Sequence, residues 1–294
     1  MQVAFLIAIT VSTLAADEKL FVAEPIPVQG FSALIEGPAC DAAGNLYAVA
    51  FGVPENIGKV TPNGKAEVFV TLPNKSRGNG IVFDPTGMMF VADYQNHNVL
   101  KIDPQTKKID VLVHEPKMNQ PNDLAIAPDG TLYASDPNWK KETGQLWKVT
   151  AKGEATLLAG EMGTTNGIDV SPDGKTLYVN ESVQRKIWSF DLTADKPEKK
   201  LFKEFPDFGF DGMRCDVDGN LYITRHGKGT VVKVSPTGKE LQEIDVLGKK
   251  PSNLCFGGED GRTVYVTEVE HTRLVKFRVD KPGLAWKRWQ EAKK

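Results

Sequence analysis

The sequence predicts an all-β fold, a six-bladed β-propeller with four antiparallel strands in each blade. Related segments begin at residues 36, 79, 122, 166, 211 and 252, so successive copies are 43, 43, 44, 45 and 41 residues apart. Each copy is a series of short apolar runs separated by turn residues, and no long apolar stripe of helical period occurs between residues 30 and 280. Four short strands in about 40–45 residues are typical of a propeller blade.

The strands of each copy follow one another in a fixed order. The first apolar run ends in an Asp/Pro/Gly turn, such as 84–87 or 172–174, and a second run rich in Tyr and Val follows, such as 132–134 or 177–179. Third strands are predicted at 99–102, 146–149, 186–190, 231–234 and 274–277. A fourth strand is clearest at 109–113 and 155–158.

Both ends of the chain need separate interpretation. Residues 1–16 contain an apolar stretch of signal-peptide length that ends in small residues, so we expect an export signal there and a single propeller domain over 17–294. A buried N-terminal strand is the alternative. The sixth copy lacks a convincing fourth strand, and we predict that the β-prone segment 20–28 supplies it and closes the ring. The tail 284–294 is either a short helix or a loose end.

Composition narrows the classes of function. The formal net charge of −2 gives no electrostatic reason to expect nucleic acid or an anionic membrane as partner. No run outside the first residues approaches membrane-spanning length. The chain has three cysteines, Cys40, Cys215 and Cys255, and no two of them form a CxxC motif. Each falls in an apolar strand, so we interpret them as small buried side chains.

The residue at the head of each copy is the main functional signal. The inner strand of a blade lines the central channel, so the residue before it lies at one mouth of that channel. All of these residues bear oxygen and none is basic: Glu36, Asn79, Asn122, Asn166, Asp211 and Ser252. Carboxylate and amide oxygens suit a hard cation, above all Ca²⁺, with Mg²⁺, Mn²⁺ or Zn²⁺ as alternatives. The competing interpretation is that pairs such as Asn79-Gly80 and Asp211-Gly212 are ordinary turns.

The heads also resemble a known family. Glu36-Gly37-Pro38, Asn122-Asp123, Asn166-Gly167 and Asp211-Gly212 are similar to the SMP-30/gluconolactonase/regucalcin family over roughly residues 30 to 280. The resemblance implies one divalent cation held by Glu36, Asn122, Asn166 and Asp211. It also implies that Asp211 is the general base or nucleophile in ester and lactone hydrolysis. Regucalcin-like members carry an Arg two residues before the equivalent of Asn122, where this chain has Gln120.

Further candidates lie where the second strand of each blade returns to the same mouth. Asp136 and Glu181 are predicted to support the ligands or contact substrate, with solvated loop acids as the alternative. Arg225 and His226 are the cationic candidates there and could bind an acidic group of the substrate. Asn79 and Ser252 are expected near the cation without being obligatory ligands.

Together these features predict a secreted or periplasmic, calcium-dependent hydrolase of lactones or related esters, acting as a monomer on a small molecule. A cation would polarise the lactone carbonyl, and Asp211 beside it would stay ionised and serve as a base. The sequence contains no GxSxG, HExxH, phosphate-binding or dinucleotide-binding motif. Two alternatives are a non-catalytic NHL-like binding propeller with a structural metal, and a related metallo-propeller that hydrolyses phosphotriesters.

Overall fold

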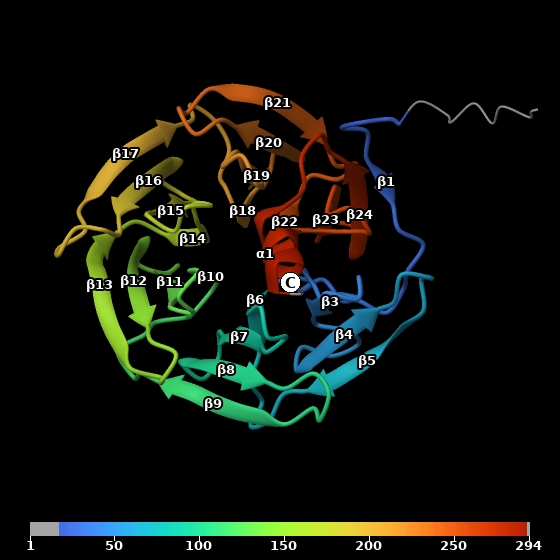
Figure 1. The fold of residues 1–294 in the computed structure, drawn as a ribbon, viewed down its shortest axis with the longest axis horizontal. Helices are drawn as coiled ribbons and strands as arrows, with labels where there is room; N and C mark the ends of the chain where they lie inside the picture. Colours follow the sequence, from blue (N-terminus) through green and yellow to red (C-terminus); the bar gives the residue numbers. More distant parts are fainter. Residues whose placement is uncertain (1–17, 293–294) are drawn as a thin grey trace, which may run out of the picture.

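The computed structural model describes residues 18–292, which form six four-stranded antiparallel sheets arranged around a central channel (Figure 1). The predicted export signal, residues 1–16, lies outside the described residues. The inner strands are β2 (Ala39–Cys40), β6 (Gly78–Phe83), β10 (Leu124–Ile126), β14 (Thr165–Val170), β18 (Met213–Cys215) and β22 (Pro251–Gly257). The second strands are β3 (Leu46–Val49), β7 (Met89–Asp93), β11 (Leu132–Asn138), β15 (Thr176–Glu181), β19 (Leu221–Arg225) and β23 (Thr263–Glu268).

The remaining strands complete each blade toward the outside. The third strands are β4 (Asn56–Val60), β8 (Asn98–Ile102), β12 (Thr143–Val149), β16 (Lys186–Asp191), β20 (Thr230–Val234) and β24 (Arg273–Arg278). The outer strands are β5 (Ala66–Thr71), β9 (Ile109–His114), β13 (Ala155–Met162), β17 (Lys199–Glu204), β21 (Glu240–Asp245) and β1 (Glu24–Pro25). The predicted six-bladed fold is confirmed.

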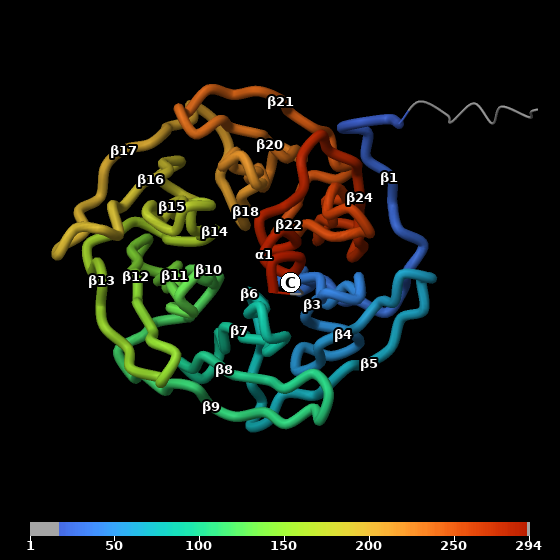
Figure 2. Tube along the Cα trace, viewed as in Figure 1, coloured from blue at the N-terminus to red at the C-terminus, as the bar shows by residue number. Residues whose placement is uncertain are grey.

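The N-terminal strand closes the ring, as predicted. β1 pairs antiparallel with β24, with Glu24 opposite Lys276 and Pro25 opposite Val275, so the last sheet has the order β1-β24-β23-β22. Ile26 continues the pairing by donating its N–H to the carbonyl of Leu274 at 2.9 Å. Figure 2 shows this first segment running along the outer edge of the last blade. The two ends of the repeat array are thereby joined by backbone hydrogen bonds.

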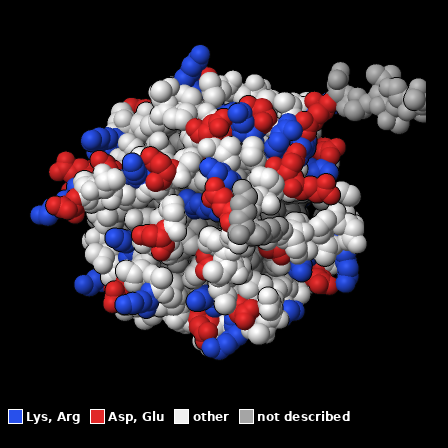
Figure 3. Space-filling model, in the orientation of Figure 1, with Lys and Arg blue, Asp and Glu red and all other residues white. Residues whose placement is uncertain are grey.

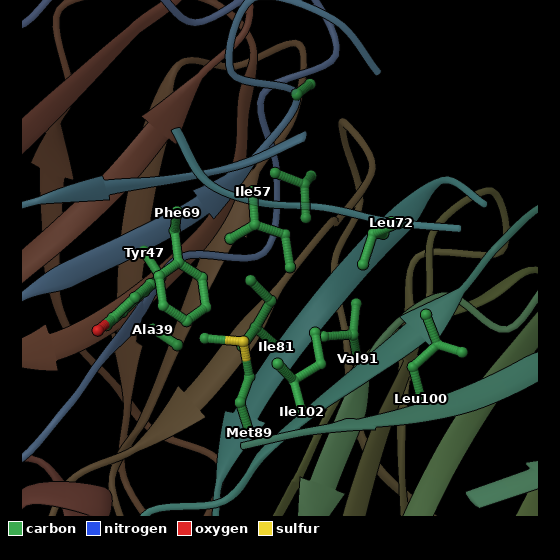
Figure 4. Packing of buried hydrophobic residues seen from close by; sticks show 12 residues of the cluster. Ala39, Tyr47, Ile57, Phe69, Leu72, Ile81, Met89, Val91, Leu100 and Ile102 are labelled. Carbon is green, nitrogen blue, oxygen red and sulfur yellow. The ribbon is translucent and has the colours of Figure 1, made fainter. Parts of the chain in front are cut away.

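The apolar core lies between neighbouring blades. Figure 4 shows Tyr47 and Phe69 of the first blade facing Ile81 and Met89 of the second. Tyr47 and Phe69 meet edge to face with ring centroids 5.0 Å apart. Each fully buried apolar side chain of this size stabilises the fold by about 1.5–3 kcal/mol, so the blades are held by their contacts with one another.

The C-terminal tail is a helix, α1 (Leu284–Ala292), over one end of the channel (Figure 1). It buries Leu284 and Trp289, and Trp289 lies 5.9 Å from the ring of Phe83. A cavity of about 60 Å³ remains between this helix and the later residues of the inner strands. Because the residues that head these strands lie at their other end, the opposite mouth of the channel stays accessible.

The surface around α1 carries both signs of charge. Figure 3 shows Lys and Arg interspersed with Asp and Glu over this face. In the part of the chain that the structure describes, no helix is long and apolar enough to cross a membrane.

All three cysteine thiols are buried, as predicted. Cys40 of the first blade and Cys255 of the last lie with their Sγ atoms 3.7 Å apart, and this contact together with burial raises the pKa of the Cys40 thiol. Burial also raises the pKa of Cys215. We therefore expect the folded protein to resist Ellman's reagent and to yield three thiols after unfolding in guanidinium. Rapid labelling of the folded protein would contradict this, and a count of one after unfolding would mean that Cys40 and Cys255 had formed a disulfide.

Candidate functional site

The open mouth of the channel is a cavity of about 310 Å³. All of the head residues line it: Glu36, Asn79, Asn122, Asn166, Asp211 and Ser252. Asn79, Asn166 and Ser252 are the second residues of their inner strands, and the other three heads stand two or three residues before theirs. The structure thus brings together every residue that the repeat analysis placed at this mouth.

The glycines that follow several heads reflect close packing of neighbouring blades. Gly167 donates its N–H to the carbonyl of Asp211 at 3.0 Å, and Gly212 donates to that of Ser252 at 2.6 Å. A Cβ at Gly167 would lie 2.4 Å from the Asp211 carbonyl oxygen, and one at Gly212 would lie 1.9 Å from Asn253 Oδ1. These Asn-Gly and Asp-Gly pairs are therefore not hairpin turns, because they mark where adjacent inner strands converge on the channel.

Two carboxyl groups dominate the electrostatics of the cavity. Burial raises the pKa of Glu36 to about 7, and the nearby Asp123 carboxylate contributes to the increase. Burial and repulsion from Glu36 also raise the pKa of Asp211. Two desolvated carboxyl groups this close cannot both ionise without a positive charge between or beside them. A cation bound between them would stabilise the ionised form of both.

The amide side chains extend the same donor set. Asn122 and Asn166 are both buried at the cavity wall. The amide nitrogen of Asn166 donates to Ser182 Oγ at 3.1 Å, while its Oδ1 has no hydrogen-bond partner among the described residues. A buried carbonyl oxygen without a partner is costly unless a ligand satisfies it. Two carboxylates and two amide oxygens fit a hard divalent cation such as Ca²⁺.

A buried ion pair lies directly beneath this donor set. Arg214 on β18 donates to both carboxylate oxygens of Asp123, at 2.7 and 2.8 Å. Burial opposes the charged form of Arg214, but Asp123 and Asp169 raise its pKa. Sequence reasoning gave neither partner a role. A signal was present, because four of the six residues that follow the heads are glycine and Asp123 is the only charged one.

Asp136 and Glu181 hold backbone instead of facing the cavity. Asp136 is fully buried and accepts the N–H groups of Asn119 and Gln120 and the indole N–H of Trp147. Glu181 accepts the N–H of Gly163 at 2.6 Å. Neither residue lines the cavity. Each carboxylate satisfies the N–H groups of the loop that leads into the inner strand of its own blade, which fixes the approach to the heads Asn122 and Asn166.

The neighbouring cationic candidates Arg225 and His226 lie in different environments. Arg225 is 1% exposed, forms an ion pair with Asp207 at 2.7 Å and lies 4.2 Å from the ring centroid of Phe205. Its guanidinium is therefore a structural group between loop and strand, and it does not line the cavity. His226 lines an adjoining hollow of about 450 Å³ that shares Asn166 and Asp211 with the main cavity. Burial lowers the pKa of this histidine.

The expectation that Arg225 and His226 are the cationic candidates at this mouth needs correction for Arg225, whereas His226 does line the hollow beside Asp211. Other cationic side chains also reach this mouth. Arg77 lines the main cavity and Arg185 lines the adjoining hollow. Sequence reasoning missed both, along with Tyr94 and Trp139 on the cavity wall. These residues lie outside the six aligned segments that defined the repeat, although Arg77 stands two residues before the head Asn79.

One further acidic group lies outside this cavity. Atoms of Glu268, Glu270 and His271 lie close enough together to suggest a metal cluster. Glu268 instead accepts the N–H groups of Lys250, Glu270 and His271 and contacts the His271 ring at 2.8 Å. It performs in the sixth blade the loop-holding role of Asp136 and Glu181.

Residues 34–270 match the family model described as the SMP-30/Gluconolactonase/LRE-like region. The chain belongs to this family. It is 29% identical over 245 residues to gluconolactonase from Zymomonas mobilis, covering 74% of this chain and 68% of that protein. It is 30% identical over 169 residues to 6-deoxy-6-sulfogluconolactonase from Pseudomonas putida, covering 55% of this chain and 58% of that protein.

Solved structures of the family support the fold. The structure of a calcium-binding protein, regucalcin, from Agrobacterium tumefaciens superposes with a TM-score of 0.77 at 22% identity, covering 90% of this chain and 95% of that one. At this identity the likeness shows the shared propeller. The family resemblance identified from Glu36, Asn122, Asn166 and Asp211 is confirmed by the match over residues 34–270.

Proposed function

We propose that this family member is a calcium-dependent hydrolase of lactones or related esters. The supporting observation is the convergence of Glu36, Asn122, Asn166 and Asp211 in one open cavity, with Asn166 Oδ1 lacking a protein partner among the described residues. The names of the relatives from Zymomonas mobilis and Pseudomonas putida, both lactonases, agree with this reaction class.

The proposed chemistry divides between the cation and the chain's own residues. A bound cation, held by the two carboxylates and two amides, would polarise the lactone carbonyl. Asp211 would take a proton from a water molecule as that water adds to the carbonyl carbon, or attack the carbon directly. The ring C–O bond then breaks, and the alkoxide leaving group takes up a proton. In the water route this gives the hydroxy acid directly, whereas after direct attack a water molecule must still hydrolyse the anhydride formed on Asp211. The loop-holding carboxylates Asp136 and Glu181 keep the ligand-bearing strands in place.

The proposal is tested by an activity screen of metal-depleted and metal-restored protein over lactones, aryl esters and phosphotriesters. We expect lactone turnover to disappear after rigorous chelation and to return with Ca²⁺, because the donor set is built for a hard cation. Turnover of phosphotriesters alone would favour the alternative hydrolase. No turnover of any substrate would favour a binding propeller.

The same samples provide a readout that does not depend on activity. Calcium binds the folded chain and not the unfolded one, so it should raise the melting temperature of the chelated protein. At 100 times the Kd the expected gain in unfolding free energy is about 2.7 kcal/mol. An unchanged melting temperature, together with no metal by elemental analysis, would overturn the cation site.

A further inference from the structure

Arg77 is the only cationic side chain that lines the main cavity within the described residues. It is exposed, and the ion pairs of the described chain do not include it. Its backbone is nevertheless fixed on both sides. The Arg77 N–H donates to Asp93 Oδ1 at 3.2 Å, and its carbonyl accepts the N–H of Tyr94 at 2.9 Å. A guanidinium on an anchored backbone can be aimed at a ligand with less loss of entropy than one on a free loop.

The anchoring shows that Arg77 occupies a defined position of the repeat. Asp93 binds the Arg77 N–H as Asp136 binds that of Gln120 and Glu268 binds that of Lys250. These anchored residues stand two positions before the heads of their blades. At this rim position the third blade carries the neutral Gln120, and the second blade carries an arginine.

The surroundings of Arg77 fit the far end of a small substrate. Tyr94 and Trp139 line the same cavity. Burial raises the pKa of Tyr94, and hydrogen bonds with the Trp139 and Gln120 side chains partly oppose this increase. These rings supply flat walls to the cavity that Arg77 also lines. At the cavity floor, where the lactone carbonyl would be placed, a divalent cation would balance the charges of Glu36 and Asp211. Among the described residues that line this cavity, the Arg77 guanidinium would then be the positive charge left to attract an anionic substituent at the rim.

We propose that Arg77 determines specificity by binding an acidic substituent of the substrate. The preferred substrates would then be sugar lactones that carry a carboxylate at the end of the molecule opposite the lactone carbonyl. This inference rests on the proposed lactone hydrolysis and adds a substrate class to it. The planar fork of Arg pairs with a carboxylate through two parallel hydrogen bonds, which a neutral hydroxymethyl group cannot form.

The test compares two lactones that differ at one carbon. D-glucaro-1,4-lactone carries a carboxylate at C6, where D-glucono-1,4-lactone carries a hydroxymethyl group. We expect the calcium-loaded wild type to favour the acidic lactone in kcat/KM, and Arg77→Gln to reduce that preference by about 10- to 100-fold. Arg77→Lys should retain part of it. High salt should weaken the preference, because Arg77 is exposed and its charge is screened.

Arg185→Gln is the matched control, because it removes another exposed arginine, from the adjoining hollow. It should leave the ratio of the two kcat/KM values unchanged. If Arg185→Gln abolishes the preference and Arg77→Gln does not, the acidic group binds in the other hollow and the assignment to Arg77 is wrong. The calcium-induced thermal shift of each variant verifies that fold and cation site are intact.

Failure of this inference can be told apart from failure of the proposed function. Calcium-dependent hydrolysis of the neutral lactone with no preference for the acidic one overturns the role of Arg77 and leaves the lactonase intact. If neither lactone is hydrolysed, calorimetric titration with glucarate and gluconate decides. Arg77-dependent binding of glucarate would support the acidic ligand class, and no binding would overturn both proposals.

Discussion

Asp211→Asn is expected to lower kcat on the best lactone by about 10²–10⁴-fold at saturating calcium, because loss of a general base usually has an effect of this size. This corresponds to about 3–5 kcal/mol of barrier at 1.36 kcal/mol per tenfold change. The asparagine keeps the size of the side chain and one coordinating oxygen, but it cannot accept the proton from water. Steady-state kinetics with bound calcium quantified in each sample measures the effect.

Asn166→Asp is the companion variant. It adds a negative charge beside the cation, so we expect tighter calcium binding with a smaller loss of rate, because a cation with more anionic ligands polarises a carbonyl less strongly. The two variants thus separate coordination from proton transfer. If Asp211→Asn binds calcium and still hydrolyses the lactone at a rate near that of the wild type, Asp211 serves only as a ligand.

The sequence was sufficient for the fold and for the floor of the cavity, because both are repeated. Six copies at nearly equal spacing define the blades, and one position in each copy must face the same mouth. Ring closure could also be predicted, since the sixth copy lacked a strand and residues 20–28 were free to supply it. These inferences depend on backbone geometry, which the repeat specifies without knowledge of any individual side chain.

The side chains at the rim of the cavity could not be predicted from the repeat in the same way. Asp136, Glu181 and Arg225 all lie at or near the ends of second strands at the mouth. Their side chains nevertheless turn to loop backbone or to Asp207 and Phe205. Position in the repeat fixes where a Cα lies, whereas the direction of a long side chain depends on which neighbours offer it hydrogen bonds. Trp139 reaches the cavity from the turn between β11 and β12, where the repeat predicts a turn without predicting which side chain enters the cavity.

Removing one partner of the buried pair Asp123–Arg214 should have the largest effect on stability. Asp123 is 1% exposed and Arg214 is its bidentate partner, so Arg214→Met would leave a buried carboxylate without its counter-charge, close to Glu36. Breaking such a pair typically destabilises a protein by about 3–5 kcal/mol. Urea unfolding of the chelated proteins measures the change without a contribution from calcium binding.

A double-mutant cycle shows whether the charge is the cause. Asp123→Asn combined with Arg214→Met removes both charges and leaves an amide that can still accept a hydrogen bond. The double variant should therefore be more stable than Arg214→Met alone, because a buried neutral group is far less costly than a buried unpaired ion. Lys65→Met, which breaks a pair with Glu67 at the surface, should produce no measurable change. If Arg214→Met and the double variant are equally unstable, Arg214 stabilises the fold through packing, and its charge pairing with Asp123 does not contribute to stability.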